Sequence, residues 1–246
     1  MHREPTERLN GRGAATAPDD GRPLQTLLGL EFLWGGFATL THSAQRTALA
    51  EVLGLLTAGE RLAAQTARTQ QGLTADPATI RFFASQTRHE AMHARVFATG
   101  QRALQPLSTP GSDSEFANFA SELARSLASG TLSASVAGCQ VVLEGLGEAL
   151  LGELDEGIRL RGLGLSRLRR IILEQERTHH GFGVALLEQS TRAGIASTAV
   201  IRRTVAQYVQ IAIDLLERNR RLFSAFDVAP ASLQARFLAT VPAGWR

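Results

Sequence analysis

Helix-forming patterns cover most of the chain, and the patterns typical of β-strands are almost absent. Aromatic residues make up 6% of the 246 residues, valine and isoleucine are sparse, and alanine, leucine, arginine, glutamate and glutamine dominate, as in helical proteins. A chain of this length can bury a sizeable core without disulfides. We therefore expect an all-α fold, with residues 23–246 as one helical domain and residues 1–22 as a disordered tail.

Four long helices are expected, arranged as two antiparallel pairs. In the first pair, Asp76 serves as an N-cap and Pro77 occupies the first helical position, which is a strong signal for a helix start. Shorter or flanking helices are expected over 114–128 and 198–225, with a short tail after Asp227. The expected ranges of the four long helices are 43–71, 77–104, 133–156 and 166–192.

Two Glu-x-x-His motifs fall on the second and fourth of these helices. They are Glu90 with His93, and Glu176 with His179. Residues three apart lie on one face of a helix, about 5–6 Å apart at Cβ, so both side chains of a motif can bind the same metal ion. One such motif would be weak support for a metal site, because chance alone produces it easily in a chain with this many glutamates.

The other two long helices each carry a glutamate within an apolar stretch, Glu60 and Glu144. A buried carboxylate is costly unless it is paired or binds a metal ion. Glu60 and Glu90 are equidistant from the turn of the first helix pair, and Glu144 and Glu176 are equidistant from the loop of the second. Residues equidistant from the turn of a helical hairpin lie at the same height. The spacing therefore predicts a four-helix bundle with a layer of carboxylates at mid-height.

This pattern resembles that of the ferritin-like di-iron carboxylate proteins, in which one glutamate from each of two helices and a Glu-x-x-His motif from each of the other two bind two metal ions. Among them, the chain is most similar to the bacterial aldehyde-deformylating oxygenases, which convert fatty aldehydes into alkanes one carbon shorter. The similarity lies in chain length, ligand spacing, the Gly59-Glu60 start and the run ERTHHGFG at 176–183. It implies a ferritin-like four-helix bundle with flanking helices. The metal ligands and catalytic residues that it implies are Glu60, Glu90, His93, Glu144, Glu176 and His179.

Three positions leave details of this site open. Many members of the family have an aspartate directly before the second Glu-x-x-His, where it hydrogen-bonds a ligand histidine. Here that residue is Gln175, which can still accept a hydrogen bond. His180 is an alternative to His179 as a ligand, and Glu148, one helical turn further on, is an alternative to Glu144.

The resemblance implies a non-haem di-iron oxygenase or oxidase that activates O₂ to oxidise a small apolar substrate, such as a fatty aldehyde. Two iron ions would be the cofactors, although the same ligands accept a manganese–iron pair. Electrons would come from an external donor such as a ferredoxin and its reductase. One alternative is a ferritin- or rubrerythrin-like protein that handles iron or peroxide, although the single cysteine cannot supply the cysteine-rich module of rubrerythrin. The other is a metal-free bundle that serves as a binding module.

A substrate cavity beside the metal ions is expected to have apolar walls. His89 is predicted to lie off the face of the ligands and to be exposed. Gly181 and Gly183 either leave room for a substrate or allow close helix packing. The candidate wall residues, each also explained by ordinary core packing, are Phe82, Phe83, Phe97, Val141, Phe182 and Val184.

The charge balance gives little support to a nucleic-acid partner. All 26 basic side chains are arginine, and 23 acidic residues leave a net charge of only +3. The pI of 10.2 reflects the lack of groups that titrate between pH 7 and 10. The apolar stretch at 24–40 contains Glu31 and is shorter than the roughly 20 residues of a membrane span. We therefore expect a cytoplasmic protein without a membrane span or a nucleic-acid partner.

Overall fold

The structure is a computed structural model that describes residues 43–104, 112–160 and 166–246. In these ranges the chain forms helices and no strand, which confirms the predicted all-α fold. The predicted tail at 1–22 and the apolar stretch at 24–40 lie outside the described residues. The α-helices are α2 (Ser43–Gln70), α3 (Pro77–Leu104), α4 (Ala117–Ala128), α5 (Leu132–Val136), α6 (Glu144–Leu160), α7 (Ser166–Arg192), α8 (Thr198–Arg218), α9 (Arg220–Ser224) and α10 (Pro230–Thr240). The other helical segments are the 3₁₀ turns η3 (Gln71–Leu73), η4 (Ser112–Phe116) and η6 (Ala243–Trp245), and the π-helical η5 (Ala137–Leu143).

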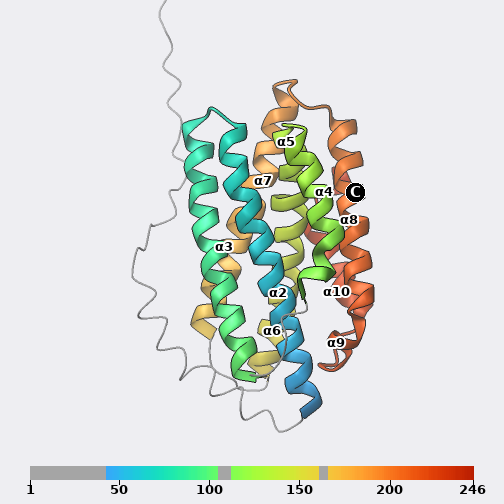
Figure 1. The fold of residues 1–246 in the computed structure, drawn as a ribbon. Helices are drawn as coiled ribbons and strands as arrows, with labels where there is room; N and C mark the ends of the chain where they lie inside the picture. Colours follow the sequence, from blue (N-terminus) through green and yellow to red (C-terminus); the bar gives the residue numbers. More distant parts are fainter. Residues whose placement is uncertain (1–42, 105–111, 161–165) are drawn as a thin grey trace, which may run out of the picture.

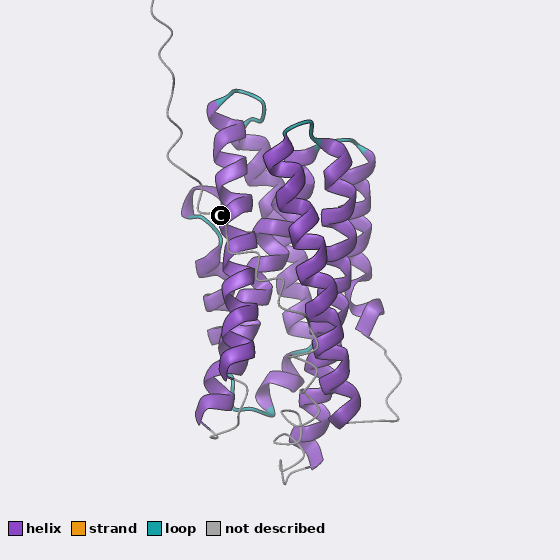
Figure 2. Cartoon of the chain, turned by 90° about the vertical axis from the view of Figure 1, so that its left-hand side faces the viewer, coloured by secondary structure: helices purple, strands orange, loops and turns teal. Residues whose placement is uncertain are grey.

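The bundle consists of four helical rods, formed by α2, by α3, by α5 with η5 and α6, and by α7; Figure 1 shows their arrangement. α2 and α3 pack against each other as one antiparallel hairpin, and α5, η5 and α6 form a continuous rod that packs against α7. The long helices lie side by side along a common direction (Figure 2). α4 and α8 cover the central rod on one side, and α10 packs against α6 and α8. The structure thus has the two predicted hairpins and the additional flanking helices.

The first hairpin turns where the sequence predicts it. Asp76 caps α3: the backbone N–H and the hydroxyl of Thr79 donate to its Oδ2 at 2.8 and 2.6 Å. These hydrogen bonds lower the pKa of Asp76. Because an N-cap satisfies a backbone donor that has no partner within the helix, this cap fixes the start of α3. The starting point sets the height of Glu90 and His93 along the bundle.

Three parts of the chain differ from the prediction. The third long helix is π-helical over Ala137–Leu143, and it continues to Leu160, beyond the glycine expected to end it. The fifth helix is interrupted at Asn219, which separates α8 from α9. The expected C-terminal tail contains α10 instead. Pro230 lies in the first turn of α10, where the missing N–H of proline costs no hydrogen bond.

The rod formed by α5, η5 and α6 is the central helix of the protein, as predicted from its apolar faces. Every residue from 135 to 146 is buried. A Cβ at Gly138 would lie 2.4 Å from the ring of Tyr208, so α8 can pack this closely only against a glycine. The segment Leu132–Glu153 is long and apolar enough to cross a membrane by length and composition, but 83% of its apolar window is buried inside the protein. Such burial is typical of a core helix.

Candidate metal centre

The four rods bring all six predicted ligand residues together at one height of the bundle. Each side chain is buried, with an exposed fraction between 0% and 5%. The glutamates are equally far from the two turns in sequence, and as this spacing predicts, they lie at the same height of the bundle. The side chains that converge are Glu60 from α2, Glu90 and His93 from α3, Glu144 from α6, and Glu176 and His179 from α7.

The six side chains form two overlapping groups, and each group could hold a metal ion. In each group, one potential ligand atom per residue lies within 4.8 Å of the others. Glu90 and Glu176 belong to both groups, so their carboxylates lie between the two positions. The first group is Glu60, Glu90, His93 and Glu176, and the second is Glu90, Glu144, Glu176 and His179.

The ring of His93 turns its Nδ1 toward three carboxylates. Its Nε2 lies 2.8 Å from Oε1 of Gln175. Because an amide oxygen only accepts hydrogen bonds, Nε2 carries the hydrogen, and Nδ1 of the neutral ring is an acceptor. This Nδ1 lies 3.0 Å from Glu90 Oε2, 3.0 Å from Glu176 Oε1 and 3.4 Å from Glu60 Oε2. Acceptors at these distances repel one another unless a proton or a metal ion lies between them.

Several buried ligand atoms have no hydrogen-bond partner among the described residues. They are both carboxylate oxygens of Glu90, Oε1 of Glu176, and Nδ1 of His93 and His179. Native proteins rarely leave buried polar atoms without a partner. Carboxylate and imidazole groups are donors that suit iron and manganese. The donor set and its unsatisfied atoms therefore fit bound metal ions.

In the protein without metal, protons occupy part of this space. Burial raises the pKa of Glu60 to about 8, and burial together with the neighbouring carboxylates raises the pKa of Glu176 well above its ordinary value. Burial opposes the charged form of His179, but the carboxylates of Glu90 and Glu144 raise its pKa to about 9. Since metal ligands must be deprotonated, metal binding at this site releases protons.

His89 is half-buried beside His179, so the prediction that it would be exposed is wrong. Its Nδ1 lies 3.2 Å from Nε2 of His179, and the two rings are 5.4 Å apart and 24° from parallel. Burial, with a contribution from the His179 ring, lowers the pKa of His89 to about 4. A neutral His89 can accept the Nε2 hydrogen of His179, and Nδ1 of His179 then faces the carboxylates.

The two alternative ligands, His180 and Glu148, belong to neither group. Glu148 Oε1 accepts a hydrogen bond of 2.9 Å from Nε of Arg177. His180 lies next to Gly145, where a Cβ would be 3.4 Å from its ring. Gln175 accepts a hydrogen bond from the His93 ring, as the sequence allows.

A chain of buried amide groups connects Glu144 to the first hairpin. Gln86 donates to Glu144 Oε1 at 2.7 Å, Gln140 donates to Gln86 at 2.9 Å, and Gln140 and Gln70 exchange two hydrogen bonds of 2.8 and 3.0 Å. All three glutamines are 0% exposed. Gln140 lies in η5, and a Cβ on Gly183 of α7 would be 2.4 Å from its Cβ. Close helix packing therefore explains this glycine. The amide chain holds one oxygen of Glu144 in place.

Replacing Gln86 with leucine is expected to weaken metal binding by roughly 10- to 100-fold, the usual cost of removing a hydrogen-bond partner from a ligand. The leucine keeps the bulk of the side chain but leaves Glu144 without its donor. The affinity is measured by titrating Co²⁺ against a competing chelator. Gln71→Leu is the matched control, because Gln71 hydrogen-bonds Thr87 outside the cluster. Equal affinities for Gln86→Leu and the unmodified protein would contradict this role.

An apolar cavity adjoins the cluster. Glu60, Glu144 and Glu176 line it, together with side chains that are almost all apolar, from α2, α6, α8 and α9. The cavity has a volume of about 40 Å³. This is more than one water molecule needs. Along α2 the lining residues run from Ala63 to Leu55, about 12 Å at ~1.5 Å per residue. The cavity therefore runs along α2 beside Glu60 and continues past it toward Leu55.

None of the six candidate wall residues lines the cavity, so of their two readings, ordinary core packing is the one that fits. Phe82 stacks on Phe182 with the ring centroids 3.5 Å apart, and Phe83 meets both rings edge-on. Phe82 also lies edge-on to His179, at 6.0 Å. These rings pack between α3 and α7, whereas the cavity is lined mainly by residues of α2, α6, α8 and α9.

The arrangement of the rods defines the fold as a ferritin-like helical bundle, with a buried carboxylate–histidine cluster that could hold metal ions. It is similar to a solved structure described as protein 19 with aldehyde deformylating oxidase activity, from Synechococcus. The TM-score is 0.70 and the identity 16%, over 80% of this chain and 87% of that chain. A scan of protein-family models and a search of curated proteins found no match. At this identity the similarity establishes the fold, so the function has to be argued from the cluster and the cavity.

Proposed function

We propose that this protein is a non-haem di-iron oxygenase or oxidase that acts on a small apolar substrate, and that this substrate is a fatty aldehyde. The observation that carries the proposal is that the apolar cavity reaches the cluster. Glu60, Glu144 and Glu176 belong to both. An apolar chain bound in the cavity would have its reactive end next to these carboxylates. The activity described for the solved structure from Synechococcus supports the choice of an aldehyde.

The cluster would hold two metal ions, one in each group of ligands, with Glu90 and Glu176 between them. The negative charge of the four carboxylates would balance the positive charge of two divalent cations. With both histidines neutral, the loaded site would carry no net charge. When bound, the iron ions would supply the electrons and the open positions for the reduction of O₂. The same donors accept a manganese–iron pair.

The side chains of the protein orient the ligands and exclude water. His89 and Gln175 accept hydrogen bonds from the rings of His179 and His93, so that each ring turns Nδ1 toward the carboxylates. Leu143 and Leu146 line the cavity next to Glu144. Their apolar surface keeps the site dry, which strengthens electrostatic interactions inside it. An external donor protein would replenish these electrons in each turnover.

The test is a turnover assay with the iron-loaded protein. The protein is loaded with Fe²⁺ without oxygen and then receives O₂, a ferredoxin with its reductase, and a series of aldehydes from octanal to octadecanal. The expected products are the alkane one carbon shorter and an equal amount of formate, measured by gas chromatography with mass spectrometry. The yield across the series shows which chain length fits the cavity. Metal-free protein is the control and should form no product.

The possible outcomes test the substrate, the reaction with O₂ and the ferritin-like alternative separately. O₂ uptake with unchanged aldehyde would remove the aldehyde and leave an oxidase for another apolar substrate. No O₂ uptake by the iron-loaded, reduced protein would remove the oxygenase and oxidase functions together. A cage-sized particle in light scattering, with iron far beyond about two ions per chain, would favour the ferritin-like alternative.

A further inference from the structure

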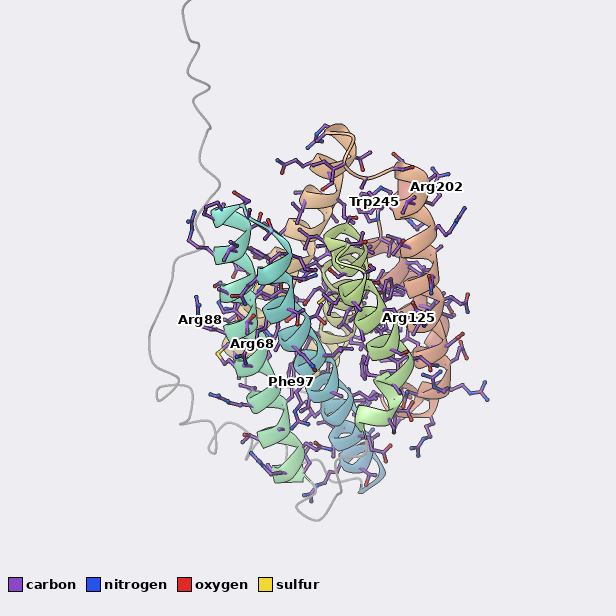
Figure 3. The ribbon with its side chains drawn as sticks, turned by 45° about the horizontal axis from the view of Figure 1, so that its top comes forward. Arg68, Arg88, Phe97, Arg125, Arg202 and Trp245 are labelled. Atoms are coloured by element: carbon purple, nitrogen blue, oxygen red, sulfur yellow. The ribbon has the colours of Figure 1, made fainter. Side chains whose placement is uncertain are left out.

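Four exposed arginines form a line along the outer face of α3. They are Arg81, Arg88, Arg95 and Arg102, each seven residues after the one before. Seven residues make nearly two helical turns, so side chains at this spacing stay on one face. The line is about 32 Å long at ~1.5 Å per residue. We call it the arginine face of α3. Figure 3 shows Arg88 at the outer edge of the bundle.

Among the described residues, the arginine face has almost no acidic counterpart: Asp76, at the start of α3, interacts electrostatically with Arg81. The only acidic residue of α3 is Glu90, which is 0% exposed and belongs to the cluster. In the part of the chain that the structure describes, no ion pair joins these four arginines to a carboxylate. Other arginines do form such pairs, for example Arg177 with Glu148, Arg218 with Glu115 and Arg221 with Glu51. A row of unpaired guanidinium groups creates a local positive potential that attracts acidic surfaces.

The arginine face lies directly behind the cluster. Arg88 is two residues before Glu90, and Arg95 is two residues after His93. Two residues correspond to a rotation of about 200° around an α-helix, so these arginines point away from the side that carries the ligands. The thickness of a single helix, about 10 Å, separates a molecule bound at this face from the cluster.

The substrate cavity lies elsewhere. Its lining residues come from α2, α6, α7, α8 and α9 and from the segments η4 and η5, and α3 contributes none of them. A partner bound to the arginine face would therefore leave the cavity accessible. It would be close to the cluster without contacting the substrate, as an electron donor requires.

We propose that the arginine face of α3 docks an acidic one-electron donor protein of the [2Fe–2S] ferredoxin kind, an inference that rests on the proposed function. Electron-transfer complexes have small interfaces, below about 1,200 Å², and charge complementarity mainly accelerates their association. The arginine face fits such a partner in length, in charge and in its distance from the cluster. An anionic membrane would also be attracted to these arginines. A membrane that delivers an apolar substrate, however, would be expected to bind beside the cavity, and α3 does not line the cavity.

The test compares two charge-reversed variants of the iron-loaded protein. Arg88→Glu/Arg95→Glu changes the arginine face, and Arg203→Glu/Arg220→Glu makes the same change of charge at exposed arginines of α8 and α9. The association rate with reduced plant-type [2Fe–2S] ferredoxin is measured by stopped flow at several salt concentrations. The arginine-face variant is expected to associate at least about tenfold more slowly at low salt, with a weaker salt dependence, and the control variant within about twofold of the unmodified rate.

Three results would overturn the docking proposal: an unchanged rate in the arginine-face variant, an equal loss in both variants, or a loss of binding to phosphatidylglycerol vesicles with ferredoxin association unchanged. Iron content and O₂ uptake with reduced phenazine methosulfate, a small neutral donor, are measured in parallel. We expect both to match the unmodified protein, since neither arginine contacts the cluster. Because docking is measured as a binding rate, failure of the proposed function appears separately, as absent O₂ uptake in every variant.

Discussion

Replacing Glu90 with alanine is expected to abolish metal binding at both positions of the cluster. Oε2 of Glu90 lies 3.0 Å from Nδ1 of His93, and Oε1 lies 2.7 Å from Nδ1 of His179. One carboxylate thus faces both histidines, and Glu90 belongs to both groups of ligands. Glu60 belongs to one group only, so Glu60→Ala should lose one metal ion and keep the other.

Elemental analysis after anaerobic loading with Fe²⁺ and desalting measures this difference. We expect about two iron ions per chain for the unmodified protein, about one for Glu60→Ala and none for Glu90→Ala. Glu148→Ala is the matched control and should keep both ions, because Glu148 pairs with Arg177. Circular dichroism shows whether each variant is folded. A folded Glu90→Ala protein that keeps both ions would refute the two-position cluster.

Filling the cavity from the α8 side is expected to lower aldehyde turnover by at least about 100-fold, because a small displacement of a bound substrate can cost this much. Leu216 of α8 lines the cavity and is not one of the six cluster residues. In Leu216→Trp the larger ring would occupy the space of the substrate chain, while the cluster stays complete. Iron content is therefore expected to remain unchanged.

An enlarging variant separates this steric effect from damage to the core. Phe223, also in the cavity wall, is replaced by alanine, and the aldehyde series is measured for both variants. Phe223→Ala should shift the preference toward longer aldehydes, and the residual activity of Leu216→Trp should shift toward shorter ones. Unfolding cannot shift chain-length preference in two directions. Unchanged preferences in both folded variants would show that the substrate does not use this cavity.

The sequence predicts the hairpins and the cluster well because both depend on local rules. Asp76 and Pro77 mark a helix start by capping alone, and a regular rise per residue converts equal spacing into equal height. Glu60 and Glu144 could therefore be placed level with the two Glu-x-x-His motifs before any contact between helices was known.

The predictions that failed depend on contacts between helices. The position of His89 in its own helix suggests exposure, but His179 of α7 covers it. Phe82 and Phe182 are apolar residues near the ligands, yet they pack against each other, and the cavity is lined by residues of α8 and α9. Pro230 reads equally well as part of a tail or as the first turn of a helix, and only the packing of α10 against α6 and α8 decides between them.

The π-helical segment Ala137–Leu143 affects how this chain should be aligned with distant relatives. Each turn of a π-helix contains more residues than an α-helical turn, so such a segment often marks a single-residue insertion absorbed inside a helix. Glu144 directly follows the segment, and Gln140 lies within it. In a relative with a regular α-helix here, the counterpart of Gln140 would have a different sequence distance from the counterpart of Glu144. A gap-free alignment across this rod would then pair residues that point in different directions.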